Sequence, residues 1–240
     1  MEKKDFFKEL YEKASEIGMN LEENQLEQFY LYMNLLLEWN EKINLTAIIE
    51  PNEVILKHFI DSITINKYIY DKKSVIDIGT GAGFPGIPLK ILNDNVKFTL
   101  VDSLNKRINF LNEVKSKLNL ENIECVHARV EEFAKNKEYR ENFDAITSRA
   151  VARLSVLVEY MLPFVKVGGT CICMKGSDIN GELEEAQKAI KILGGEVEKV
   201  EHFNLPDTDI ERNIVIIKKV KSTPKQYPRK AGTPTKQPIV

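Results

Sequence analysis

The sequence lacks the long hydrophobic runs that membrane spans require. Uninterrupted apolar stretches are only a few residues long, as at Leu35–Leu37, whereas a helix needs roughly 18 apolar residues to cross a bilayer. The first residues, Met1-Glu2-Lys3-Lys4-Asp5, carry charges with no apolar segment behind them. We therefore expect no secretory signal and no membrane partner.

Cysteine is also scarce, with three in 240 residues. Cys125, Cys171 and Cys173 are an odd number, and their spacing is not that of metal ligands. We therefore expect neither a disulfide framework nor a metal site, and the scarcity favours a cytoplasmic location.

No acidic residue follows Glu211, although the chain has 36 aspartates and glutamates. The segment from 218 to 240 instead contains seven bases: Lys218, Lys219, Lys221, Lys225, Arg229, Lys230 and Lys236. The other 27 bases stand against 36 acids, so a segment of charge +7 follows a body of charge −9. This asymmetry points to a polyanionic partner such as nucleic acid, although a solvated tail with a coincidental charge bias is the alternative. Four prolines in the segment predict an extended arm, partly laid over the core.

Length and composition predict one large domain with a smaller region attached. A hydrophobic fraction of 43% with 29% charged residues excludes intrinsic disorder for most of the chain. The pattern divides the chain into an N-terminal helical cap at 1–72, an alternating region at 73–220 and the basic tail at 221–240.

The first segment has helical periodicity. Its first two helices have apolar residues at helical spacing, namely Phe6, Phe7, Leu10, Tyr11, Ala14 and Ile17, then Leu26, Phe29, Tyr30, Met33, Leu36 and Leu37. Asn20 and Glu23 resemble a capping box that opens the second helix. Pro51 suits the first position of a third helix, with Ile55, Phe59 and Ile63 facing inward.

From residue 74 onward, strands and helices alternate. The predicted strands are Ser74–Ile78, Lys97–Val101, Ile123–Val126, Phe143–Thr147 and Thr170–Met174. The predicted helices lie near Ile87–Leu92, Lys106–Lys117, Glu131–Glu138, Leu154–Phe164 and Glu182–Leu193. Such alternation predicts an α/β fold with a mostly parallel sheet covered on both faces. The last two strands, Glu196–Phe203 and Asn213–Lys219, have no helix between them and predict an antiparallel hairpin at one edge.

A glycine-rich turn follows the first strand, where Asp77-x-Gly79-x-Gly81-x-Gly83 leads to Pro85, which we expect to begin a helix. Glycine allows a positive φ and lets a ligand approach the backbone. Gly81-x-Gly83-x-x-Gly86 matches the dinucleotide fingerprint, and Asp102 follows at the spacing of a ribose-binding acid. Read from Asp77 onward, the same segment resembles the first motif of Rossmann-like S-adenosylmethionine-dependent methyltransferases. We favour this second interpretation, because Asp77 suits a ligand that carries an ammonium and would repel a pyrophosphate. A structural turn that binds no ligand is the third alternative.

Three further strand ends supply candidate binding residues. Asp102 can accept hydrogen bonds from both ribose hydroxyls, or it can cap the following helix. Val130 and Glu131 lie in the loop where this class of methyltransferase contacts adenine, and the alternative is a helix start whose acids complement the helix dipole. Arg149 follows the fourth strand, where it could hold an acceptor phosphate or the methionine carboxylate, or form a surface ion pair.

Taken together, these residues resemble one family, the 16S ribosomal RNA guanine-N7 methyltransferases G, also called glucose-inhibited division protein B. The resemblance covers nearly the whole chain. It rests on Trp39-Asn40-x-x-x-Asn44-Leu45-Thr46, His58-x-x-Asp61-Ser62, Asp77-Ile78-Gly79-Thr80-Gly81-Ala82-Gly83-Phe84-Pro85-Gly86-Ile87-Pro88, Val101-Asp102-Ser103, Ser148-Arg149-Ala150-Val151 and Pro228-Arg229-Lys230-Ala231-Gly232-Thr233-Pro234.

The resemblance implies a Rossmann-like domain with an N-terminal helical region. It implies methyl transfer from S-adenosylmethionine to N7 of one guanine in the decoding region of 16S rRNA. The implied cofactor contacts are Gly79, Phe84, Val130, Glu131 and Arg149. The partner would be 16S rRNA or the assembling small ribosomal subunit, and we expect a monomer. A small-molecule methyltransferase is the alternative, but it would not need the basic tail, whereas a non-catalytic RNA-binding protein would not need the cofactor motif.

Methylation at guanine N7 needs no general base, because N7 carries a free lone pair. Proximity and alignment could therefore supply most of the rate, and we assign no catalytic residue beyond placing Arg149 near the acceptor. His58 and Asp61 could form a general-base dyad, but packing or rRNA contact is the favoured interpretation. Trp39 could stack on a nucleotide or pack between domains.

Overall fold

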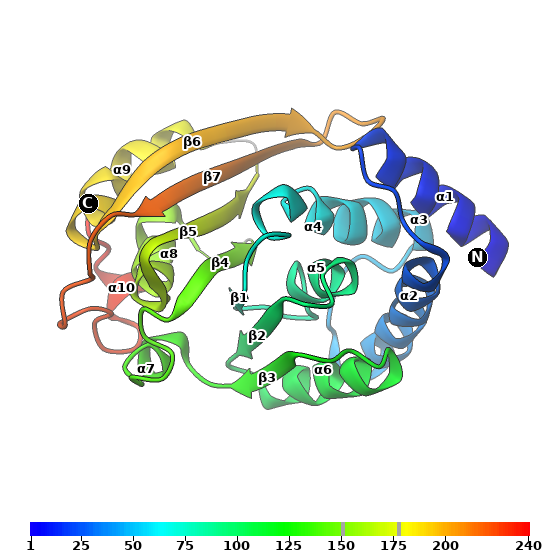
Figure 1. The fold of residues 1–240 in the computed structure, drawn as a ribbon, viewed down its shortest axis with the longest axis horizontal. Coiled ribbons are helices and arrows are strands. Elements are labelled where there is room, and N and C mark those ends of the chain that lie inside the picture. The colour runs from blue at the N-terminus through cyan, green and yellow to red at the C-terminus, as the bar shows by residue number, and fades with distance from the viewer. Residues whose placement is uncertain (150–151, 177–178) are drawn as a thin grey trace.

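A computed structural model describes residues 1–149, 152–176 and 179–240. Ala150 and Val151 of the Ser-Arg-Ala-Val motif lie outside the described residues. The chain forms a seven-stranded sheet in the order β3-β2-β1-β4-β5-β7-β6 (Figure 1). The strands are β1 (Ser74–Ile78), β2 (Lys97–Asp102), β3 (Ile123–His127), β4 (Phe143–Arg149), β5 (Val165–Lys175), β6 (Gly195–Asn204) and β7 (Glu211–Lys219).

Strand directions confirm the predicted mixed sheet. The first five strands pair in parallel, while β7 runs antiparallel to both β5 and β6. The strand order reverses between β1 and β4, and in open α/β sheets the crevice at such a reversal, outside the carboxyl ends of the strands, is where ligands bind.

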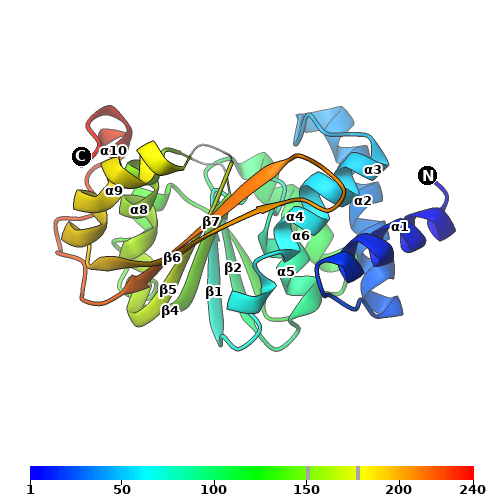
Figure 2. The ribbon, with the colours of Figure 1, turned by 90° about the horizontal axis from the view of Figure 1, so that it is seen from above.

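Helices cover both faces of the sheet (Figure 2). The helices are α1 (Lys3–Glu16), α2 (Glu23–Ile43), α3 (Pro51–Val54), α4 (Asp61–Ile63), α5 (Gly86–Leu92), α6 (Asn105–Lys117), α7 (Val130–Phe133), α8 (Leu154–Met161), α9 (Asn180–Ile192) and α10 (Thr233–Lys236). A π-helical segment (Ile55–Ile60) joins α3 to α4, and 3₁₀ turns follow at Asn66–Tyr68 and Leu162–Phe164. No helix in the described ranges is long and apolar enough to span a bilayer.

Two hydrophobic cores lie on opposite faces of the sheet. Neighbouring strand residues alternate between them, as Val75 and Ile76 do, because successive side chains of a strand point to opposite faces. The first core unites one face with α1, α2, α5 and α6, whereas α8 and α9 pack on the other. The N-terminal helices thus share their core with the sheet.

Several local predictions need correction. The capping box of α2 is formed by Glu22 and Gln25, not by Asn20 and Glu23. Tyr32 and Leu35 are among the buried residues of α2, while Tyr30 and Leu37 are only partly buried. The buried face is therefore rotated from the predicted one, because α2 packs against α5 and α6 as well as α1.

Other helix starts are close to their predicted positions. Pro51 is the first residue of α3, as predicted, and Ile55, Phe59 and Ile63 are buried. Pro85 precedes α5 as its N-cap instead of beginning the helix. The helix predicted at Glu131–Glu138 is the short α7, which ends at Phe133.

Candidate functional site

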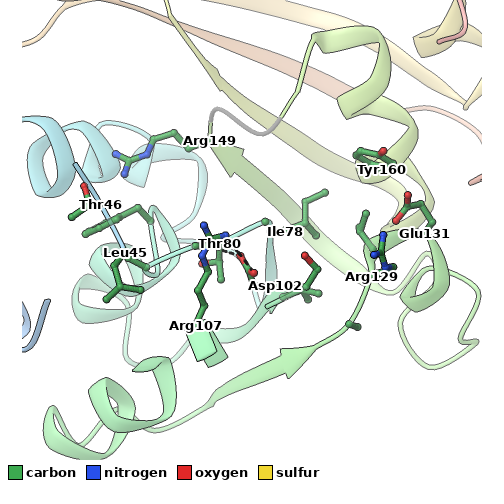
Figure 3. Close-up of a pocket in the computed structure, with 18 of the residues that line it drawn as sticks. Leu45, Thr46, Ile78, Thr80, Asp102, Arg107, Arg129, Glu131, Arg149 and Tyr160 are labelled. Carbon is green, nitrogen blue, oxygen red and sulfur yellow. Dashed lines mark hydrogen bonds and ion pairs between the residues drawn. The ribbon is translucent and has the colours of Figure 1, made fainter. Parts of the chain in front are cut away.

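A cavity of about 530 Å³ opens at the carboxyl ends of β1 to β4 (Figure 3). Its wall includes Gly79 and Gly81 after β1, Asp102 at the end of β2, and Val130 after β3. Parallel strands bring these loops to one edge of the sheet, so residues far apart in sequence face one space.

The glycine turn gives the cavity its floor. Gly79, Gly81 and Gly83 have φ values of 64°, 62° and 99°, a region that side chains other than glycine rarely adopt. A Cβ at Gly81 would meet no protein atom closer than 4.0 Å, whereas one at Gly83 would lie 2.6 Å from Ile87. Gly81 therefore leaves its backbone open to a ligand, and Gly83 allows the turn to pack on the helices. The hydroxyl of Tyr32 in α2 donates to the carbonyl of Ala82 and ties the helical region to this turn.

Asp102 lies on the cavity wall and holds the neighbouring loops in place. Its Oδ2 accepts from the backbone N–H of Gly81 at 2.9 Å, and its Oδ1 accepts from that of Leu104 at 2.9 Å. Arg107 forms an ion pair with the carboxylate at 3.1 Å. The N-cap of α6 is Leu104, with no side-chain cap, so the alternative reading of Asp102 as the helix cap is wrong.

Asp77 lies beneath the turn and is fully buried. Its Oδ2 accepts from the Thr80 hydroxyl at 2.6 Å and from the Gly86 N–H at 3.0 Å. Desolvation raises the pKa of Asp77 to about 7. Its Oδ1 has no hydrogen-bond partner among the described residues, and Asp77 is not part of the cavity lining.

The loop after β3 forms the opposite wall, with Arg129, Val130 and Glu131. The backbone N–H groups of Val130 and Glu131, at the start of α7, have no acceptor among the described residues. The carboxylate of Glu131 accepts from the N–H of Gly232 in the C-terminal tail at 3.0 Å. Tyr160 lines the same wall and hydrogen-bonds Thr235 at 3.0 Å. The tail therefore supports this side of the cavity.

The end of the cavity that lies away from Glu131 and Tyr160 is lined by Leu45, Thr46, His58, Phe84 and Arg149 (Figure 3). The His58 ring stacks on Phe84 with centroids 4.4 Å apart, and the Arg149 guanidinium lies 5.0 Å from the Phe84 centroid. Desolvation, assisted by the nearby Arg149 charge, lowers the pKa of His58 to about 3. The imidazole is therefore neutral at physiological pH.

Asp61 connects two arginines behind this end. It accepts from Arg149 at 3.1 Å and from Arg212 of β7 at 2.9 Å. A second cavity of about 410 Å³ adjoins the first, sharing His58 and Arg149, and it is also lined by Lys57, Lys175 and Arg212. The Asp61 carboxylate accepts from the two arginines, and no hydrogen bond joins it to the His58 ring among the described residues.

The Trp39–Asn40 motif has a structural role. The Trp39 ring packs on Phe110 of α6 and its Nε1 donates to Glu113 at 3.1 Å, which agrees with packing between the helical region and the sheet domain. The Asn40 side chain accepts from the N–H of Thr46 at 2.8 Å and fixes the loop at the cavity mouth.

The structure brings the predicted site residues together around one cavity, with the exception of Asp77. Sequence reasoning missed Arg107, Arg129, Tyr160 and Arg212. Arg107 lies five residues after Asp102, a spacing that could have suggested the pair. Tyr160 and Arg212 reach the site only through the packing of α8 and β7, for which the sequence has no local signal.

The cavity fits S-adenosylmethionine in three respects. A carboxylate for ribose, free backbone donors for adenine and a glycine floor open to close approach line one space. Among the described residues, no group of three or more histidine, cysteine or acidic side chains could hold a metal ion.

Two solved methyltransferase structures share this fold. A methyltransferase from Aquifex aeolicus described as dependent on S-adenosylmethionine superposes with a TM-score of 0.52 at 17% identity, over 70% of this chain and 93% of that one. A similarly described O-methyltransferase from Thermotoga maritima gives a TM-score of 0.53 at 15% identity, over 79% and 72% of the two chains. At this identity the likeness shows the fold alone.

Relatives by sequence are much closer. A ribosomal RNA small subunit methyltransferase G from Acetivibrio thermocellus is 54% identical over 96% of this chain and 95% of its own length. A protein of the same name from Desulforamulus reducens is 55% identical over 96% and 97% of the two chains. A model of the family described as rRNA small subunit methyltransferase G matches residues 25–215. The chain therefore belongs to the rRNA small subunit methyltransferase G family.

Proposed function

We propose that this protein transfers the methyl group of S-adenosylmethionine to N7 of one guanine in the decoding region of 16S rRNA. Family membership supports the rRNA substrate. The end of the cavity lined by Thr46, His58 and Arg149 is where the acceptor base would lie, and we call it the acceptor end. The choice of N7 is supported by one observation: the described residues at the acceptor end include no free base. His58 is neutral there and both of its ring nitrogens have hydrogen-bond partners.

An acceptor with a free lone pair fits such a site. Guanine N7 attacks without first losing a proton, so the protein need only align the two reactants and exclude water. The carboxylates that line the cavity are engaged elsewhere: Asp102 by three donors, and Glu131 by Gly232 on the opposite wall. Neither is placed to accept a proton from the base.

The cofactor residues follow from the same geometry. S-adenosylmethionine supplies an electrophilic methyl group on a cationic sulfur. Asp102 would accept from the ribose hydroxyls, and the backbone N–H groups of Val130 and Glu131 would hold the adenine. Gly79 and Gly81 would let the backbone approach the ligand, with Phe84 and Arg149 at the methionine end. Asp77 would act from beneath, by ordering Thr80 and Gly86.

The experiment is methylation of small ribosomal subunits isolated from cells that lack the protein. With labelled S-adenosylmethionine we expect one methyl group per particle, at a guanine that becomes sensitive to the strand cleavage specific for N7-methylguanine. Asp102→Ala tests the ribose contact and should weaken cofactor binding by about 1–3 kcal/mol in calorimetry. Labelling of another base or atom, or of small molecules only, would overturn the proposal.

The biological setting is part of the proposal. We expect the protein to work as a monomer in the cytoplasm, on 16S rRNA or the assembling small subunit. The exposed lysines of the tail, including Lys225, Lys230 and Lys236, support an electrostatic contact with rRNA phosphates.

A further inference from the structure

The hydroxyl of Thr46 lies at the acceptor end of the cavity. Thr46 lines the same space as Arg149, and Figure 3 shows both on the side away from Glu131 and Tyr160. Asn40 fixes its backbone through the 2.8 Å hydrogen bond from the Thr46 N–H. The side chain is therefore held on the wall opposite the proposed adenine contact.

The hydrogen-bond roles around Thr46 follow from the chemistry of arginine. His58 Nδ1 lies 3.2 Å from an Arg149 nitrogen, and a guanidinium can only donate. Nδ1 must therefore accept, which places the ring proton of the neutral imidazole on Nε2. That N–H donates to Thr46 Oγ1 over 2.8 Å.

The Thr46 oxygen has a second donor. The backbone N–H of Ile48 reaches Oγ1 at 3.0 Å. A hydroxyl has two lone pairs and one hydrogen, so the N–H groups of His58 and Ile48 occupy both acceptor positions. The Thr46 hydrogen is then left to donate, and it has no acceptor among the described residues.

We propose that Thr46 donates this hydrogen to O6 of the acceptor guanine and so selects guanine over adenine. On the major-groove edge, guanine presents O6 as an acceptor beside N7, whereas adenine presents an N6 amino donor there. A hydroxyl that can only donate forms a hydrogen bond with guanine O6. It cannot bond to the adenine N6 amino group, because two donors cannot pair. The lone pair of N7 stays free for the methyl group. This inference rests on the proposed N7 activity and names how that activity recognises its base.

The test combines a protein variant with a base variant. We compare kcat/KM for the wild type and for Thr46→Val, each on 16S rRNA particles with guanine or 2-aminopurine at the target position. 2-Aminopurine keeps N7 and has hydrogen in place of O6. The ratio of kcat/KM on guanine to kcat/KM on 2-aminopurine should be about tenfold larger for the wild type than for Thr46→Val, which is the loss typical of one hydrogen bond. Thr46→Ser, which keeps the hydroxyl, should discriminate like the wild type.

Cofactor affinity separates a contact with the base from other roles. Thr46→Val should bind S-adenosylmethionine as tightly as the wild type in calorimetry. A lost affinity would mean that the hydroxyl faces the methionine carboxylate, and equal discrimination by the wild type and the variant would mean that it does not read O6; either result overturns the inference. Thr46→Ala serves if Thr46→Val does not fold. Failure of the wild type to methylate N7 in unmodified particles would instead overturn the proposed function.

Discussion

At the scale of single residues, the acceptor end of the site is organised by Arg149. Its guanidinium donates to Asp61, to His58 and to the carbonyl of Lys57. The His58 and Asp61 side chains both bond to Arg149, and neither is left free as a base. Their three-residue spacing in sequence therefore reflects a shared arginine and not a general-base dyad.

This arrangement predicts a measurable pH dependence of stability. The pKa of His58 is lowered to about 3 in the folded protein, against about 6.5 in an unfolded chain. Between these values the unfolded chain binds a proton that the native protein does not. The stabilisation is present above about pH 6.5 and is lost as pH falls toward 3, at about 1.4 kcal/mol per pH unit.

The comparison with His58→Gln isolates this contribution. The raised pKa of Asp77, about 7, acts oppositely, because its stabilisation is present at low pH and lost as pH rises through 7. Asp77 contributes to both proteins and cancels in their difference. We expect the free energy of unfolding, measured in urea, to fall for the wild type relative to the variant as pH decreases from about 6 to 4. Parallel curves would show that His58 titrates normally.

At the scale of elements, the C-terminal tail is part of the folded domain. The Arg229 side chain and backbone N–H bond to Glu159 of α8 at 2.6–3.1 Å, and Glu159 is fully buried. Arg140 donates to tail carbonyls, including that of Tyr227. Lys219 is buried and bonds to Glu141 and Thr223. Lys219 and Arg229, two of the seven bases of the segment 218–240, are thus engaged inside the protein, so the expectation that the whole basic segment faces a polyanionic partner needs correction for these two.

Breaking this anchor should destabilise the whole domain. Arg229→Ala leaves the buried Glu159 carboxylate without its cation, and we expect a loss of about 3 kcal/mol in the free energy of unfolding. Combining it with Glu159→Gln removes the unpaired charge and should recover part of the loss. A double variant no more stable than Arg229→Ala in urea unfolding would contradict this account.

At the scale of the whole molecule, the remaining tail bases are the candidates for RNA contact. Replacing Lys225, Lys230 and Lys236 by glutamine should reduce the slope of log affinity for rRNA against log salt by about two units. The slope falls because fewer phosphates are neutralised, so that fewer counterions are released on binding. S-adenosylmethionine affinity should not change.

A matched control uses exposed lysines far from the tail. Lys4 and Lys8 of α1 and Lys117 of α6 are exposed, and replacing them by glutamine changes the net charge by the same amount. The control should keep the wild-type salt slope. Equal slopes for the control, the tail variant and the wild type would remove the tail from the RNA interface.

The sequence by itself determined the alternating strands and helices, the glycine turn and the position of Asp102. These features depend on local spacing: apolar periodicity specifies a strand or a helix, and a positive φ at Gly79 and Gly81 favours glycine. It also indicated the edge hairpin, since no helix separates the last two strands. The exact faces of α2 were not determined, because they depend on which helices pack against it.

Only the tertiary structure decided how distant segments complete the site. Arg212 of β7 reaches Asp61, and Gly232 of the tail reaches Glu131. The donor role of Thr46 likewise depends on His58 and Arg149, which meet it from other elements. Such contacts form because the sheet order and the two cores bring these elements together, and hydrogen bonding then assigns each buried polar atom a partner. No spacing along the chain records that arrangement.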